Sequence, residues 1–178
     1  MSLIVRIARP EDAPALDRVF LSSYATLWAP AYDAEVLARA LPFVTRANPK
    51  LLSSGTFYLC EAPDGGVVGA GGFSLDRPGS GEIASGVAHV RHFATLPEWT
   101  GRGVGRALYG RCERDAQARG VEVFECNAAL NAVPFYAAMG FDTVGETSVP
   151  LGPAVAMRAM VMRKVLGPPG GTPPVPRG

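Results

Sequence analysis

The sequence predicts an α/β (α+β) fold, with a mixed, partly antiparallel and twisted sheet of about seven strands flanked by helices. Three observations lead to this prediction. Apolar segments of strand length alternate with segments of helical periodicity along the 178 residues. A Pro-Asp-Gly-Gly turn at residues 63–66 joins two strand segments as a hairpin. A later strand, a glycine-rich turn and an amphipathic helix follow one another as in a parallel crossover connection.

The first half of the chain is predicted to contain a strand, two helices and the hairpin. Residues 3–9 alternate as a strand does, and Pro10 suits the first position of a helix that runs to about Tyr24. A loop containing Pro30 follows, and a second helix opens at Asp33, a residue type that caps helices well. The two hairpin strands are predicted at residues 55–62 and 67–76.

The second half is predicted to supply four more strands and two more helices. A strand at residues 87–96 leads into the glycine-rich turn and its helix, and a buried strand follows at residues 121–127. A short helix at residues 131–140 ends at a glycine, and two further strands close the sheet. Residues 1–166 are thus predicted to be one domain. The proline- and glycine-rich segment 167–178 is predicted to be a disordered tail.

Composition narrows the classes of partner. The formal net charge is +1 with no block of like charge, so we expect no nucleic-acid partner. The apolar run near the N-terminus is too short for a membrane span or a signal sequence, so we expect no membrane partner and a cytoplasmic location. Cys60, Cys112 and Cys126 are too widely spaced for a zinc site or a disulfide framework, which predicts buried reduced thiols and no metal. The apolar residues 154–162 are interpreted as a sheet edge that pairs with a second copy in a homodimer.

Residues 96–120 combine glycines, arginines and a helix start, a combination that favours phosphate binding. The first N–H groups of a helix are unpaired and attract anions, glycines let the backbone approach a ligand, and arginines add charged donors. A nucleoside-triphosphate loop requires Lys-Ser/Thr after the last glycine, and a dinucleotide fingerprint requires a glycine where this chain has Leu108. Neither pattern is complete. The residues concerned are Gly101, Arg102, Gly103, Gly105 and Arg106.

Residues 99–108, WTGRGVGRAL, resemble the loop of the GCN5-related N-acetyltransferases, Arg/Gln-x-x-Gly-x-Gly/Ala, which binds the pyrophosphate of acetyl-CoA. The two defining glycines match Gly103 and Gly105, whereas Thr100 occupies the position of the family's Arg or Gln. Residues 127–141 resemble the family's distal segment, with an Asn-containing loop followed by Phe-Tyr and Gly-Phe. The resemblance implies a GNAT-type sheet that is splayed between its fourth and fifth strands, and acetyl-CoA as the acyl donor.

The resemblance also implies that an acceptor amine attacks the acetyl thioester directly. The backbone of Phe93 and Thr95 would pair with the pantetheine arm as a sheet edge pairs with a peptide, and Tyr136 would protonate the leaving thiolate. Asn131 is either a helix N-cap or a hydrogen-bond partner of the coenzyme arm. The predicted donor-binding residues are Phe93, Ala94, Thr95, Thr100, Gly101, Arg102, Gly103, Val104, Gly105, Arg106, Asn131 and Phe135.

The group that removes the amine proton is left open. His89 and Glu82 are the candidates near predicted strand ends, and bulk water is the alternative. Regular strand alternation predicts that His89 and Arg91 share a face with Phe93, with His92 on the opposite face.

The acceptor is predicted to be a primary amine of a small molecule or a peptide. Tyr24, Trp28 and Tyr32 recur every four residues. They are either an apolar stripe that packs on the sheet or an aromatic wall of the acceptor pocket, suited to an apolar or cationic amine. The predicted activity is N-acetyl transfer from acetyl-CoA. The alternative is a non-catalytic module of the same fold that binds or senses acyl-CoA.

Overall fold

The computed structural model describes residues 2–168, in which seven strands form one sheet in the order β1-β2-β3-β4-β5-β7-β6. Neighbouring strands are antiparallel except β4 and β5, which are parallel. The predicted mixed sheet is confirmed. The strands are β1 (Ile4–Ile7), β2 (Phe57–Glu61), β3 (Val67–Ser74), β4 (Val87–Thr95), β5 (Val123–Ala129), β6 (Asp142–Pro150) and β7 (Ala156–Val165).

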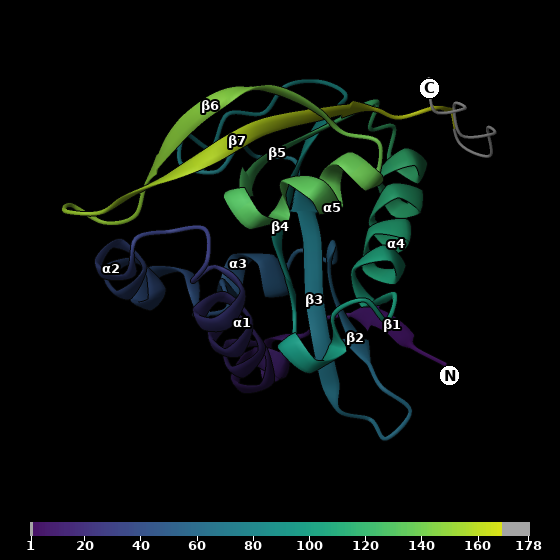
Figure 1. The fold of residues 1–178 in the computed structure, drawn as a ribbon. Helices are drawn as coiled ribbons and strands as arrows, with labels where there is room; N and C mark the ends of the chain where they lie inside the picture. Colours follow the sequence, from purple (N-terminus) through teal and green to yellow (C-terminus); the bar gives the residue numbers. More distant parts are fainter. Residues whose placement is uncertain (1, 169–178) are drawn as a thin grey trace.

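Helices cover both faces of the sheet. Figure 1 shows α1 and α2 on one side of strands β2–β4 and α4 on the other, with β6 and β7 arching over the top of the view. Each side has its own apolar cluster. The predicted helix from Pro10 begins as a 3₁₀ turn, and the short α3 was not predicted. The helical segments are η1 (Pro10–Asp12), α1 (Ala13–Leu27), α2 (Ala34–Val44), α3 (Pro49–Leu52), η2 (Pro97–Trp99), α4 (Val104–Ala118), η3 (Leu130–Ala132) and α5 (Val133–Ala138).

Strands β4 and β5 pair only over their first residues. The parallel register ends at His89 and Glu125. Beyond this pair, β4 continues to Thr95 with β3 as its partner, and β5 continues to Ala129 with β7 as its partner. The two strands therefore diverge with their facing edges unpaired between them. This confirms the predicted splay between the fourth and fifth strands.

A β-bulge interrupts β4 within the splayed segment. Arg91 and Ala94 are three residues apart, yet their partners on β3 are only two residues apart. His92 and Phe93 therefore share the place opposite Gly71. His92 has a φ of 49°, in the left-handed region that residues other than glycine adopt uncommonly. The extra residue changes the direction of every later side chain in β4.

The bulge overturns the side-chain alternation predicted for β4. Arg91 shares its face with the residue after the bulge, which belongs to the apolar cluster under α1. The His92 ring also faces α1, 5.7 Å from the Phe20 ring between centroids. A Cβ atom at Gly71 would lie 2.6 Å from the Phe93 ring, so Phe93 lies on the α4 face. The prediction that Arg91 shares a face with Phe93, opposite His92, was wrong because it assumed a regular strand.

The last strand is not at the edge of the sheet. β7 lies between β5 and β6, and β6 forms the edge. The apolar segment 154–162 therefore lacks the exposed edge on which the homodimer prediction rested, and the homodimer stays an untested prediction. Residues 169–178 of the predicted tail lie outside the described residues.

The three cysteines are buried and free, as predicted. Within residues 2–168, no helix is long and apolar enough to cross a bilayer. The same part of the chain contains no group of three or more His, Cys, Asp or Glu side chains arranged to hold a metal ion.

Candidate active site

Helix α4 begins without a side-chain cap. Its N-cap is Gly103, whose φ of 85° is left-handed and is adopted by glycine without strain. The first bond at this end of the helix runs 2.9 Å from the Ala107 N–H to the Gly103 carbonyl, so the N–H groups of residues 104–106 precede the helical ladder. In α2, by contrast, Asp33 accepts two N–H groups of the first turn, as predicted. The start of α4 is therefore open to a ligand.

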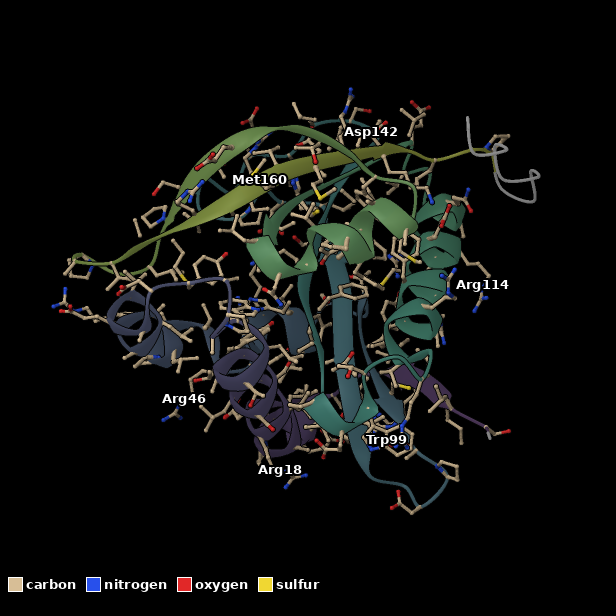
Figure 2. The ribbon with its side chains drawn as sticks, viewed as in Figure 1. Arg18, Arg46, Trp99, Arg114, Asp142 and Met160 are labelled. Atoms are coloured by element: carbon tan, nitrogen blue, oxygen red, sulfur yellow. The ribbon has the colours of Figure 1, made fainter. Side chains whose placement is uncertain are left out.

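Two side chains of the turn before α4 have partners within the turn itself. The Thr100 hydroxyl donates to the Pro97 carbonyl at 2.8 Å. The Arg102 guanidinium lies over the Trp99 ring, 4.9 Å from its centroid, and Figure 2 shows Trp99 at the end of the sheet away from β6 and β7. Arg106 is exposed on the first turn of α4. The turn thus keeps its backbone free while two arginines lie close by.

Helix α5 packs against both the start of α4 and the splayed segment of β4. A Cβ atom at Gly105 would lie 2.9 Å from the Phe135 ring, so a glycine is required for this approach. The Phe93 ring lies 6.0 Å from the Phe135 ring and 6.2 Å from the Tyr136 ring between centroids. The predicted donor residues of β4, α4 and α5 are therefore contiguous.

A cavity of about 620 Å³ lies beside the splayed strands. It brings the predicted acceptor residues together with the predicted proton donor and one candidate base. Of the residues predicted to bind acetyl-CoA, Phe93 lines this cavity. The turn before α4 lies outside the cavity. The predicted site residues among its lining are Tyr24, Trp28, Tyr32, His89, Phe93 and Tyr136.

The aromatic residues of α1 and the following loop form one wall of this cavity. The Tyr24 and Trp28 rings stack with centroids 4.2 Å apart, and the Tyr32 ring lies 5.8 Å from the Trp28 ring. The Tyr32 hydroxyl donates to the Arg158 carbonyl at 2.7 Å and accepts the Leu130 N–H at 2.9 Å. These bonds fasten the loop to β7 and η3. Tyr24 also packs in the core, as the predicted apolar stripe requires, and the role of these rings in an acceptor pocket stays a prediction.

His89 meets a carboxylate where β4 and β5 diverge. Its Nδ1 atom lies 4.0 Å from Oε2 of Glu125, and both residues line the cavity. Burial lowers the pKa of His89 from 6.5, and the Glu125 charge opposes this shift in part. The imidazole is therefore neutral at pH 7 and can accept a proton there.

Glu125 was not predicted as a site residue. Its carboxylate lies 3.6 Å from Nη2 of Arg77 and 4.0 Å from Nε of Arg163. Its place opposite His89 depends on the register between two strands that are distant in sequence. The other candidate base, Glu82, lies on an exposed loop outside the cavity, 3.8 Å from Arg77.

Tyr136 is buried but lines the cavity. Burial raises the pKa of Tyr136 well above 10, so the phenol keeps its proton at neutral pH. Asn131, by contrast, is exposed in η3 and does not line the cavity. The N-cap of α5 is Ala132, so the N-cap alternative for Asn131 was wrong.

Comparisons with known proteins identify the fold and the family of the chain. The family model described as "Acetyltransferase (GNAT) domain" matches residues 29–161. A GCN5-related N-acetyltransferase structure from Rhodopseudomonas palustris has a TM-score of 0.73 at 23% identity, covering 93% of this chain and 97% of that chain. A GCN5-related N-acetyltransferase structure from Kribbella flavida has a TM-score of 0.59 at 27% identity, covering 92% of this chain and 98% of that chain.

A third similar structure is a PaiA N-acetyltransferase from Thermoplasma acidophilum in complex with coenzyme A. Its TM-score is 0.65 at 19% identity, covering 93% of this chain and 99% of that chain. No curated protein sequence matches the chain significantly. The family match spans most of the chain and coincides with the splayed sheet and the glycine-rich turn. The chain therefore belongs to the GNAT acetyltransferase family.

Proposed function

We propose that the protein transfers an acetyl group from acetyl-CoA to the primary amine of a small molecule or a peptide. The observation that carries this proposal is the divergence of β4 and β5 between the uncapped start of α4 and the cavity. The similar enzyme from T. acidophilum was solved with coenzyme A, which supports the choice of donor.

The turn before α4 fits the diphosphate of the donor. Added Cβ atoms at Gly101 and Gly103 would meet nothing within 4 Å, so the backbone there is open to a ligand. The unpaired N–H groups at the helix start would bind the phosphates, with Arg102 and Arg106 adding charge. Thr100 replaces the family's Arg or Gln and is bonded to Pro97, so phosphate binding falls to the backbone and these arginines.

The free edge of β4 fits the amide-rich arm of the donor. Residues 90–95 lie beside β3 on one side, where the bulge at His92 and Phe93 interrupts the pairing, and have no β5 partner on the other side. The backbone groups of Phe93, Ala94 and Thr95 that face β5 can therefore pair with the arm, as a sheet edge pairs with an added strand. The thioester would then lie beside Tyr136 of α5.

The reaction needs one proton acceptor and one proton donor. The amine nitrogen forms a bond to the acetyl carbon as the bond from that carbon to sulfur breaks. His89 takes the proton that the amine loses, directly or through a water, and Glu125 stabilises the imidazolium. Tyr136 gives its phenolic proton to the departing sulfur. We choose His89 over Glu82 because Glu82 lies outside the cavity.

An assay of thiol release from acetyl-CoA over a panel of primary amines tests this function. Tyr136→Phe should lower kcat by about 10²–10⁴-fold, the usual contribution of a general acid, with acetyl-CoA affinity within about twofold by calorimetry. Tyr109→Phe is the matched control. Tyr109 is 3% exposed and Tyr136 is 6% exposed, but Tyr109 does not line the cavity.

The outcomes separate the enzyme from a binding module. A module that only binds acyl-CoA would give a calorimetric signal and no thiol release with any amine. Full activity in Tyr136→Phe would remove Tyr136 as the acid while leaving the transferase intact.

A further inference from the structure

The charges around the cavity do not balance. Among the described residues, its lining contains three arginines, Arg77, Arg91 and Arg158, and one carboxylate, Glu125. Arg158 is neutralised by Glu146, with Nε 2.6 Å from Oε1. Arg77 lies 3.6 Å from Glu125. Arg91 is the cation of the lining that has no carboxylate within ion-pair distance in the described part of the chain.

Most hydrogen-bond donors of the Arg91 guanidinium remain available to a ligand. Its side chain is half-buried, and its Nη1 atom donates to the Ser74 hydroxyl at 2.9 Å. A guanidinium carries five N–H donors, so most of them are left for other partners. The nearby carboxylate of Asp76 pairs instead with Lys50, at 3.4 Å. Burial lowers the pKa of Arg91, and the Asp76 charge offsets this shift only in part, so a second anion would replace solvation that the charged form has lost.

Arg91 is close in the strand to the proposed base, His89, because both residues precede the bulge in β4. Arg91 lies two residues from His89 on the same face, about 7 Å along the strand. Both residues line the cavity whose opposite wall contains Trp28 and Tyr24. A small molecule can therefore present an amine to His89 and an anion to Arg91 at once, with an apolar part against the aromatic rings.

We infer that the acceptor is a small amino carboxylic acid with an apolar or aromatic side chain, whose carboxylate binds Arg91. This inference rests on the proposed function, because it concerns the acceptor of the same site. Arg91 is a specificity-determining residue in this arrangement and takes no part in the proton transfers. A guanidinium binds a carboxylate through two parallel hydrogen bonds, which orient the acceptor as well as hold it.

A second place for the anion must be distinguished. A smaller cavity of about 240 Å³ shares Arg91 with the main one and is lined by two further cations, Lys50 and Arg119. An anion bound there would also depend on Arg91. It would depend on Lys50 too, whereas a carboxylate in the main cavity would not.

The kinetic test compares amines that differ only in the carboxylate. The first compounds to compare are L-phenylalanine, L-phenylalaninamide and 2-phenylethylamine, followed by a panel of α-amino acids and their carboxamides. The rates are corrected for the fraction of each amine that is neutral. We expect kcat/KM for the acids to exceed that for the carboxamides by about 10–100-fold, the contribution of hydrogen bonds to a charged group. Arg91→Gln should bring this ratio close to one, chiefly through KM, and Arg91→Lys should restore part of it. Arg158→Gln, which alters an arginine that is already paired, should keep the ratio.

A binding test needs no turnover. 3-Phenylpropanoate, which has the carboxylate and the ring but no amine, should bind the parent protein in calorimetry and bind Arg91→Gln at least about tenfold more weakly. Lys50→Gln should bind it as the parent does. Equal kcat/KM for acids and carboxamides, a preference that survives in Arg91→Gln, or a loss in Lys50→Gln would each overturn the inference. Binding through Arg91 without thiol release from any amine would refute the proposed function, and with it the role of the bound acid as an acceptor, while the carboxylate site at Arg91 would stand.

Discussion

A glutamate in place of Gly103 tests whether the open start of α4 binds a diphosphate. Gly103 is the N-cap, and a Cβ atom there would meet no neighbour within 4 Å, so the new side chain has room. Two costs follow. The φ of 85° strains any residue with a side chain, by about 1–2 kcal/mol. The carboxylate also occupies the N-terminal end of the helix, where the helix dipole favours a negative charge.

The charge term sets the size of the effect on binding. At about 6 Å, two like charges repel by roughly 0.7 kcal/mol at the dielectric constant of water and by roughly 3 kcal/mol at an effective value of 20. A diphosphate carries two such charges, and salt reduces both terms. A loss of at least about 1.4 kcal/mol, which is tenfold in Kd, is therefore expected. The new carboxylate would also compete for the same N–H groups.

Calorimetric titration with acetyl-CoA measures this loss, and two variants separate its causes. Gly103→Ala has the backbone strain without the charge and should keep most of the affinity. Gly110→Glu places the same charge on the same helix, about 10 Å further on, at a glycine with open space and a helical φ. It should bind acetyl-CoA within about twofold of the parent. Undiminished affinity in Gly103→Glu, with a cooperative melt that shows an intact fold, would refute phosphate binding at this turn.

Two further predictions concern the bulge. Gly71→Ala would place a Cβ atom 2.6 Å from the Phe93 ring, so we expect a destabilisation of about 1–3 kcal/mol and a fall in Tm of roughly 3 °C per kcal/mol. An unchanged Tm would contradict the placement of Phe93. Burial and the Arg91 charge lower the pKa of His92 from 6.5 to about 4 in the folded protein. As the pH falls below 6.5, the imidazole is therefore protonated in the unfolded chain before it is protonated in the folded one. Stability should therefore be lost between pH 6.5 and 4, by up to about 3 kcal/mol. Asparagine tolerates a left-handed φ and does not titrate in this range, so His92→Asn should lack this loss. Urea denaturation at pH 7 and pH 4.5 measures it, and equal losses in both proteins would contradict the lowered pKa.

The features that the sequence predicted are those with local signals. Asp33 was expected to cap α2, and it accepts two N–H groups of the first turn, because a cap depends only on residues two or three positions apart. The hairpin and the glycine-rich turn were found for the same reason, since a turn type and a helix start are encoded within a few residues. The order of helices and strands along the chain then followed from the alternation of these local elements and from the family resemblance.

The features that it did not predict depend on pairing between distant segments. Glu125 lies beside His89 because of a parallel register between β4 and β5, and no property of either segment alone sets that register. The interior position of β7 in the sheet likewise depends on its pairing with β5, which is distant in sequence. Arg91 was therefore known as a strand residue but was not recognised as a cation of the cavity lining.

In the function that we propose, the bulge lets one strand contact two bound molecules. In a regular strand, Arg91 and Phe93 would point to the same face, so the guanidinium and the aromatic ring would compete for one space. With His92 as an extra residue, Arg91 faces the α1 side, where the aromatic wall lies, while the Phe93 ring faces α5. Gly71 leaves the room that the Phe93 ring needs on that second face. In the proposed arrangement the acceptor and the donor would therefore approach from opposite faces of β4 and meet where its unpaired edge is open towards β5.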